Sequence, residues 1–306
     1  MSQKILHRPP ILQKGDAVSI VAPASFFDRE IFEEALKQIK SWGFRPKYRQ
    51  DIFSKQRYLA GSDSRRAEEL IQALKDPETK AVFLARGGYG CSRLLPYLDQ
   101  LEERPPPKIV VGYSDATVLL NYLHQAWSWV TFHGPVLVKD IARTLRSAGK
   151  ASLFQNLLKN QALGEIKPAT LEVLHPGHAQ GKLIGGCLSL IAHTVGTPYQ
   201  LKTQGCILYL EDVDEALYRL DRMLTQLRYA GLFKDLQGIV LGPFKGCHED
   251  PACLKDFLKE QFVDFKGPIL WGFPSGHCED TWTLPLGVEI EIKNGALFFC
   301  KSALED

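Results

Sequence analysis

The stretch Lys108-Ile109-Val110-Val111-Gly112-Tyr113-Ser114-Asp115-Ala116 decides the fold that this sequence predicts. Its β-branched apolar run, 109–111, follows three prolines and indicates a buried strand entered from a stiff loop. After the turn, apolar residues recur at helical spacing, at Val118, Leu119, Tyr122 and Leu123. A serine on a sharp turn between a strand and a helix is typical of a nucleophile elbow.

Ser114 has two interpretations at this point. The usual elbow is G-x-S-x-G, and Ala116 stands here in place of the second glycine, so the motif by itself is weak. Turns between strands and helices also commonly carry a serine as a helix N-cap. The local sequence favours the N-cap, and only the rest of the chain can change that preference.

Strands and helices alternate through the first half of the chain. We expect strands at 17–22, 45–48, 81–85 and 109–111, with helices between them, and such crossovers imply a mostly parallel sheet. Ligands of these sheets bind beyond the carboxyl ends of the strands. The turn Arg86-Gly87-Gly88-Tyr89-Gly90 and Ser114 both lie at such ends. The amides of that turn can bind an anion or an oxyanion, or its glycines can serve a tight turn alone.

The alternation weakens between 147 and 181, where prolines and glycines accumulate. We therefore expect an N-terminal domain at 1–165, a linker at 166–180 and a C-terminal domain at 181–306. The second domain would contain a strand at 206–210 that ends in Glu211-Asp212, and a final hairpin turned by Asn294-Gly295. A chain of 306 residues is long enough for two cores.

The composition argues against several classes of protein. The net charge is +2 without a long basic run, so nothing favours nucleic acid as a partner. No stretch approaches the roughly 18 apolar residues of a membrane helix, and 1–15 lacks the apolar core of a signal peptide. The seven cysteines form no C-x-x-C pair and indicate reduced thiols in the cytoplasm. No His, Cys, Asp and Glu set has the spacing of a metal site.

A serine nucleophile needs a base, and the base needs an acid that orients it. Among the eight histidines, His133 and His277 remain after those in the N-terminus, linker, helices and a charged loop are set aside. Glu211 is the leading acid because it follows an apolar strand, although Glu211 and Asp212 can equally be acidic residues at a helix start. The order Ser114, Glu211, His277 is that of the α/β-hydrolases.

Seven short motifs occur in order along nearly the full chain, and together they resemble the L,D-carboxypeptidases of murein recycling. These serine peptidases also include microcin C7 self-immunity proteins. The motifs are Ala22-Pro23-Ala24-Ser25, Arg86-Gly87-Gly88-Tyr89-Gly90, Gly112-Tyr113-Ser114-Asp115, Phe132-His133-Gly134-Pro135, Gly185-Gly186-Cys187-Leu188-Ser189, Leu210-Glu211-Asp212 with Tyr218 and Asp221-Arg222, and Gly276-His277 with Leu284-Pro285-Leu286-Gly287.

The resemblance implies a Ser-His-Glu triad at Ser114, His277 and Glu211, with no metal or other cofactor. It implies an α/β fold: a flavodoxin-like N-terminal domain with a parallel sheet, and a smaller swivelling-type β/α C-terminal domain. The site would lie between the two domains, and the protein would be a homodimer.

The implied reaction releases terminal D-alanine from murein tetrapeptides by hydrolysis of an L,D peptide bond. The amides of Asp115 and of Gly87 or Gly88 would form the oxyanion hole. Arg86 is the first candidate for the substrate carboxylate, because a guanidinium binds a carboxylate through two hydrogen bonds.

Two departures from the family pattern bear on specificity. Cys187 stands where the family usually has asparagine, and the loop after His277 carries Cys278, Glu279 and Trp282. Two alternatives stay open. One is an immunity-type amidase that cleaves aminoacyl-sulfamoyl-nucleotides, in which Trp282 would stack on the base. The other, less favoured, is a non-catalytic muropeptide binder.

Overall fold

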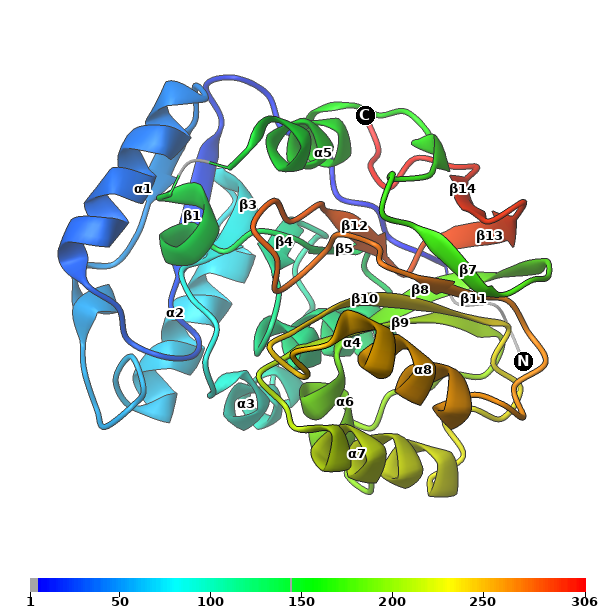
Figure 1. Cartoon of the computed structure of the whole chain (residues 1–306). Coiled ribbons are helices and arrows are strands. Elements are labelled where there is room, and N and C mark those ends of the chain that lie inside the picture. Colours follow the sequence, from blue (N-terminus) through cyan, green and yellow to red (C-terminus); the bar gives the residue numbers. More distant parts are fainter. Residues whose placement is uncertain (1–4, 144) are drawn as a thin grey trace.

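Two β-sheets organise the chain in the computed structural model, which describes residues 5–143 and 145–306 (Figure 1). Residues 1–4 of the expected polar N-terminal segment therefore lie outside the described part. The α/β fold expected from the sequence is confirmed. Within the described ranges, no helix has both the length and the apolar character needed to cross a membrane.

The first sheet has six strands in the order β12-β5-β4-β3-β1-β2. Its five N-terminal strands pair in parallel, and their order, β2-β1-β3-β4-β5, is that of flavodoxin-like folds. The bounds are β1 Ala17–Val21, β2 Arg45–Lys47, β3 Thr79–Leu84, β4 Ile109–Gly112, β5 Thr131–His133 and β12 Leu284–Leu286.

Helices cover this sheet because their apolar residues fall on one side. In α1, Phe32, Ala35, Leu36 and Ile39 recur at helical spacing and are buried. The Ser62 hydroxyl caps α2, as its position in the sequence indicates. The bounds are α1 Arg29–Ser41, α2 Asp63–Lys75, α3 Leu95–Asp99, α4 Ala116–Trp127 and α5 Ser147–Leu158, with short turns of helix at η1 Gln50–Phe53, η2 Cys91–Leu94 and η3 Leu137–Ile141.

The second sheet has eight strands in the order β6-β14-β13-β8-β9-β10-β11-β7. Its centre, from β8 to β11, is parallel, and antiparallel strands flank it. The hairpin expected at Asn294-Gly295 is confirmed. The bounds are β6 Gly164–Ile166, β7 Glu172–His175, β8 Ala179–Cys187, β9 Cys206–Val213, β10 Gly238–Lys245, β11 Ile269–Trp271, β13 Glu289–Lys293, β14 Ala296–Phe299, α6 Leu188–Thr194, α7 Leu217–Tyr229 and α8 Pro251–Gln261.

The first sheet includes a strand from the C-terminal half of the chain. Strand β12, from the C-terminal half, pairs antiparallel with β5 in the first sheet, and Figure 1 shows it beside β5 and β4. The expected linker, 166–180, contributes β7 to the second sheet. The domain boundaries stay a prediction, because each sheet contains chain from beyond the expected linker or from within it.

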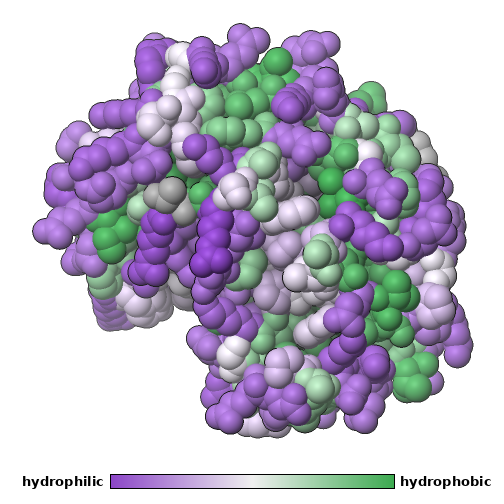
Figure 2. All heavy atoms as spheres, turned by 45° about the horizontal axis from the view of Figure 1, so that its top comes forward, coloured by the Kyte–Doolittle hydropathy of each residue, from purple (hydrophilic) through white to green (hydrophobic). Residues whose placement is uncertain are grey.

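The outer surface is mainly hydrophilic on the face shown in Figure 2, where separate hydrophobic areas lie between the hydrophilic side chains. Helix α4 lies instead in the interior, between the first sheet and α6 and β8 of the second. Most of its residues are buried, as expected for a mainly apolar helix that packs against other elements on more than one side. The turn that carries Ser114 precedes this helix, so the interior helix anchors the candidate site.

Candidate active site

Ser114 has a backbone conformation that is unusual for serine. Its φ is +63°, in the left-handed region, on the turn between β4 and α4. The N-cap position of α4 is taken by Asp115, and no side chain caps the helix there. The N-cap interpretation of Ser114 therefore has no support in the geometry. Strained backbone of this kind occurs at functional sites more often than elsewhere.

Gly87 lies directly against the Ser114 hydroxyl. A Cβ at Gly87 would be 3.1 Å from Ser114 Oγ and 3.7 Å from the amide nitrogen of Asp115. Within the described residues, the amides of Gly87, Gly88 and Asp115 donate no hydrogen bond to another protein group. The glycine turn and the start of α4 thus leave unpaired amides beside one hydroxyl, which is the composition of an oxyanion site.

His277 and Glu211 form a buried hydrogen-bonded pair. Glu211 Oε2 is 2.6 Å from His277 Nδ1 and also accepts the backbone amide of His277 at 3.1 Å. The Tyr113 ring packs edge-on against the imidazole, with ring centroids 5.0 Å apart. The histidine ring is therefore held on two sides, and its Nδ1 carries the proton when the ring is neutral, because the partner is a carboxylate.

Glu211 lies inside a strand rather than after it. The strand expected at 206–210 continues to Val213, so that Glu211 is a fully buried residue of β9. Gly276, the residue before His277 in the loop that faces this strand, has a φ of +97°. A Cβ at Gly276 would be 2.5 Å from the Glu211 carboxylate. Only glycine allows the loop to bring His277 so close to the acid.

The charge of Glu211 depends on its neighbours. Burial opposes ionisation of the carboxyl, but the nearby imidazoles of His133 and His277 outweigh burial and lower its pKa to about 2. Glu211 is therefore an anion at neutral pH. An anion at this position orients an imidazole and stabilises its protonated form.

Asp212 points to the other side of the strand and has a different role. Its carboxylate accepts the backbone amides of Ser189, at 2.7 Å, and Val213, at 2.8 Å. It thus satisfies a backbone amide in the first turn of α6, where acidic residues are favoured. Of the two adjacent carboxylates, only Glu211 contacts His277.

Ser114 and His277 line one cavity of about 520 Å³. Arg86, Gly87 and Gly88 line it too. Arg86 is exposed and donates a 2.6 Å hydrogen bond from its guanidinium to the carbonyl of Phe26. Within the described residues, no group of three or more His, Cys, Asp or Glu side chains has an arrangement that can hold a metal ion.

Two cations of the cavity were missed by the sequence analysis. Lys139, in η3, and Arg143, shortly after it, both line the space in front of Ser114. Their position a few residues beyond the carboxyl end of β5 is the signal that would have indicated them, because that end of the sheet carries the site.

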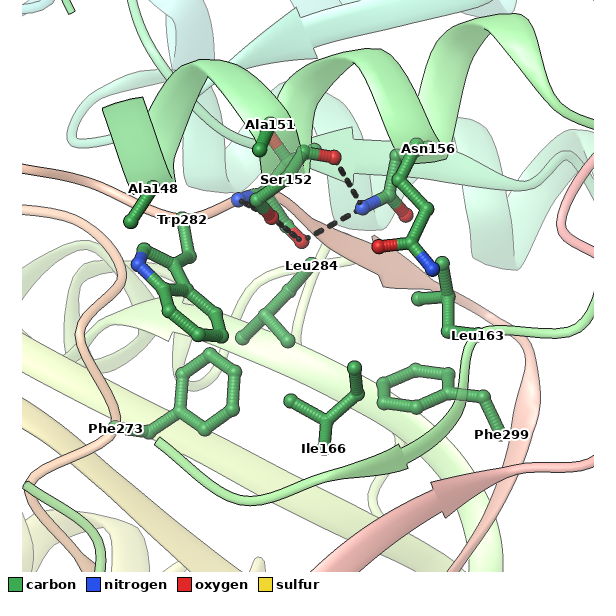
Figure 3. A pocket seen from close by; sticks show the side chains of 12 residues that line it. Ala148, Ala151, Ser152, Asn156, Leu163, Ile166, Phe273, Trp282, Leu284 and Phe299 are labelled. Carbon is green, nitrogen blue, oxygen red and sulfur yellow. Dashed lines mark hydrogen bonds between the residues drawn. The ribbon is translucent and has the colours of Figure 1, made fainter. Parts of the chain in front are cut away.

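Trp282 does not line this cavity. It faces a separate apolar cavity of about 240 Å³ between α5, β6 and β14, where Figure 3 shows its ring beside Phe273. The expectation that Trp282 adjusts the fit of a substrate, or stacks on a base, is therefore wrong for this structure. Cys187 is also absent from the cavity lining and packs against Ser189 and Asp212.

The paired glycines at 185 and 186 bring β8 against the nucleophile helix. A Cβ at Gly186 would be 2.5 Å from Thr117 Oγ1, and one at Gly185 would be 2.0 Å from the carbonyl oxygen of Tyr209. Thr117 Oγ1 accepts the amide of Cys187 at 3.0 Å, so helix and strand are hydrogen-bonded. This motif serves the packing that fixes Ser114 relative to the second sheet.

The strained serine beside unpaired amides, together with the buried histidine and glutamate pair, has the composition of a serine hydrolase site on an α/β fold. The chain belongs to the LD-carboxypeptidase family: the family's N-terminal domain model matches 18–134 and its C-terminal domain model matches 180–292. The family expected from the motifs is thereby confirmed, and the protein is a peptidase.

Two relatives with carboxypeptidase names align over most of the chain. A probable murein peptide carboxypeptidase of Bacillus subtilis (strain 168) is 38% identical over 92% of this chain and 90% of its own. The murein tetrapeptide carboxypeptidase of Pseudomonas aeruginosa is 33% identical over 88% of this chain and 91% of its own.

Solved structures share the fold. The microcin C7 self-immunity protein MccF, in complex with glutamyl sulfamoyl guanosine, superposes with a TM-score of 0.88 at 21% identity, over 97% of this chain and 99% of its own. The muramoyltetrapeptide carboxypeptidase from Oxalobacter formigenes has a TM-score of 0.78 at 26% identity, over 92% and 97% of the two chains.

Proposed function

We propose that this protein is a serine carboxypeptidase that hydrolyses the L,D peptide bond of murein tetrapeptides and releases the terminal D-alanine. The single observation that carries the proposal is the buried Glu211–His277 pair, whose histidine lines the same cavity as the strained Ser114. The names of the two relatives support murein peptides as the substrate class.

In the proposed mechanism, Ser114 Oγ attacks the carbonyl carbon at the L-centre of the diamino acid residue. His277 takes the hydroxyl proton and gives it to the leaving amine of D-alanine as the peptide bond breaks. Water then attacks the acyl-enzyme, with His277 again as the base, and Ser114 is regenerated. Glu211 orients the imidazole and stabilises its charge throughout.

The oxyanion that forms in each step is assigned to the unpaired amides of Asp115 and of Gly87 or Gly88. Their support is the closeness of Gly87 to Ser114 Oγ. The substrate carboxylate is assigned to Arg86, which lines the same cavity. Lys139 and Arg143 are the next candidates for that contact, since they supply positive charge to the same space.

The immunity-type amidase has less support than the carboxypeptidase. The aromatic side chain expected to stack on a nucleobase, Trp282, lines the separate apolar cavity. A non-catalytic binder has no use for a strained serine, a histidine and a buried glutamate in one site. Comparing rates on murein tetrapeptide and on an aminoacyl-sulfamoyl-nucleotide separates the two enzymatic alternatives.

The decisive experiment digests murein tetrapeptide and reads the products by mass. We expect the loss of one alanine with the wild type and none with Ser114→Ala, and a fluorophosphonate probe should label only the wild type. Glu211→Gln should reduce turnover by about 10²–10⁴-fold, because a neutral amide stabilises the imidazolium poorly. Asp212→Asn is the matched control, and activity lost there but kept in Glu211→Gln would contradict the assignment.

We further propose that the protein acts in the cytoplasm. All seven cysteines are free thiols in the structure, as is usual in a reducing compartment. The homodimer implied by the family resemblance also stays a proposal, and analytical ultracentrifugation of the full chain tests it.

A further inference from the structure

His133, the last residue of β5, lies behind Glu211 and has no part in the mechanism above. The side chain is completely buried. Its two ring nitrogens face different groups: Nδ1 is 2.9 Å from the Ser275 hydroxyl, and Nε2 is 3.8 Å from Glu211 Oε1. The protonation of these two nitrogens follows from their surroundings.

The proton on Nδ1 is determined by Ser275. The Ser275 hydroxyl is 2.7 Å from the carbonyl oxygen of Trp282, and a carbonyl can only accept a hydrogen bond. The single hydroxyl proton therefore points to Trp282. Since Ser275 has no second proton to donate to the imidazole, His133 Nδ1 must donate to Ser275 and carries a proton of its own.

The state of Nε2 is determined by Glu211. Within the described residues, neither His133 Nε2 nor Glu211 Oε1 has a hydrogen-bond partner, and both side chains are inaccessible to solvent. A neutral ring with its proton on Nδ1 would present the Nε2 lone pair to a carboxylate oxygen. A second proton on Nε2 replaces that repulsion with a buried ion pair and leaves Glu211 with a compensating charge.

We propose that His133 is a positioning residue held as an imidazolium, paired through Nε2 with Glu211 Oε1, so that Oε2 alone serves His277. The inference rests on the proposed triad. In this arrangement the carboxylate stays ionised while His277 is neutral and able to accept a proton. Because His133 and His277 face the same carboxylate, removal of a positive charge from His133 favours the protonated form of His277.

Six other ionisable groups lie around the pair, and burial raises the pKa of each of them. Burial raises the pKa values of the two tyrosines and two cysteines near the pair, so they stay neutral at neutral pH, whereas burial raises the pKa of Asp140 to about 6. Asp140 therefore titrates in the working range and needs its own control. The groups are Tyr113, Tyr209, Cys187, Cys278, Asp140 and Asp212.

The protonation of His133 can be measured without a substrate. In ¹⁵N NMR spectra of the full chain labelled at its histidine rings, the His133→Asn variant identifies the His133 signals by their loss. We expect both His133 nitrogens to be protonated at about pH 8, where an ordinary histidine, with a pKa of about 6.5, is neutral. A proton on Nδ1 and a bare Nε2 at that pH would overturn the proposal.

The effect on His277 can be measured from the pH dependence of labelling of Ser114 by a fluorophosphonate. His133→Asn retains a donor near Ser275, and His133→Gln places a neutral donor near Glu211, but both lose the charge. The acidic limb of this profile is the fall in labelling rate at low pH. We expect its midpoint to shift to higher pH by roughly 1 unit in both variants. His124→Asn is the control, because within the described residues His124 Nδ1 hydrogen-bonds to the carbonyl of Trp129, 3.0 Å away, and not to a group of the candidate site.

These outcomes separate the inference from the proposed function. A limb that stays in place in both folded His133 variants contradicts the ion pair, and a limb that disappears in Asp140→Asn would assign it to the Asp140 carboxyl instead. If His133→Asn does not fold, His133→Gln serves for both measurements, the pH profile of labelling and the identification of the His133 NMR signals. A wild type that the probe does not label contradicts the triad, while the NMR measurement still decides the charge of His133.

Discussion

Ser114 adopts a left-handed backbone conformation, which costs a residue other than glycine about 1–3 kcal/mol. Packing around the turn holds this conformation. Tyr113 is buried before it, Asp115 is buried after it, and Gly87 leaves room for the hydroxyl on the open side. The position of one oxygen atom thus depends on three neighbours, of which Tyr113 and Gly87 also line the cavity.

Gly276 is the residue whose replacement tests the contact between the loop and the acid. We expect Gly276→Ala to abolish most turnover and to destabilise the fold, because its Cβ would collide with Glu211 at a positive φ. The strain of an alanine at positive φ alone costs about 1 kcal/mol or somewhat more. Chemical denaturation and tetrapeptide turnover measure the two effects.

Gly231→Ala is the matched control for this substitution. Gly231 also has a positive φ, of +77°, but a Cβ there has no atom within 4 Å. The variant should lose the strain energy only and keep its turnover. Equal losses of activity in the two variants would show that the collision with Glu211 is unimportant.

Arg86 is tested by removing the charge that it is proposed to bind. A guanidinium binds a carboxylate through two charge-assisted hydrogen bonds, and a tetrapeptide with an amidated terminus cannot form this ion pair, so it should be a poor substrate for the wild type. Arg86→Ala should narrow the difference in kcat/KM between the acid and the amide. Arg86→Lys should also be impaired, because an ammonium group cannot form the two parallel hydrogen bonds of a guanidinium. If Arg86→Ala discriminates as strongly as the wild type, the same comparison in Lys139→Ala and Arg143→Ala identifies the cation that binds the carboxylate.

At the scale of elements, helix α4 and strand β8 are joined by side chains of the helix. The Asn121 amide donates to the carbonyl of Gly185 at 2.9 Å and accepts the Gly185 amide at 3.2 Å. The strand has glycines at 185 and 186, so its backbone groups approach the helix closely. The contact connects the turn that carries Ser114 to the sheet that carries Glu211.

We expect Asn121→Leu to destabilise the protein by about 1–3 kcal/mol, because both backbone groups of Gly185 lose a buried partner. Turnover should fall as well, since α4 fixes the turn at Ser114. Urea denaturation measures the first effect and tetrapeptide digestion the second. Asn160→Leu, which removes a surface contact with Asp306, is the control and should change stability by less than about 0.5 kcal/mol. Equal midpoints for the two variants would contradict this role of Asn121.

At the scale of the whole molecule, buried carboxyls make stability depend on pH. Burial raises the pKa of Glu69 to about 7, against the lowering effect of Arg65 and of the Ala22 amide that it accepts. Between about pH 4.5 and 7 the folded state therefore holds a proton that the unfolded chain releases, and the free energy of unfolding falls as the pH rises. Asp115 and Asp140, both raised to about 6, act in the same direction.

The variant Glu69→Gln tests this linkage. We expect its free energy of unfolding, relative to that of the wild type, to increase from pH 5 to pH 8, because only the wild type loses stability through this group as it ionises. Urea denaturation at several pH values measures the difference. Glu68→Gln, exposed on the same helix, is the control for removing a carboxylate. A difference between Glu69→Gln and the wild type that stays constant with pH would contradict the raised pKa.

Local patterns determined much of this protein. The strand, sharp turn and helix around Ser114, the hairpin at Asn294-Gly295 and the parallel alternation of the first half follow from residues that are close along the chain. Each depends on backbone preferences and on one apolar face, which a short window contains. The assignment of Glu211 and His277 to the candidate site came instead from the resemblance to a known family.

Other features depended on the tertiary structure. Strand β12 joins the first sheet beside β5, about 150 positions earlier, and this pairing follows from burial in the assembled core rather than from any local pattern. Three further features depend on how distant segments pack together. They are the direction of the Trp282 ring, the presence of Lys139 and Arg143 in the cavity, and the position of His133 behind Glu211. Sequence spacing determines which side of an element a residue occupies, whereas the residue that it meets is decided by the lowest free energy of the whole fold.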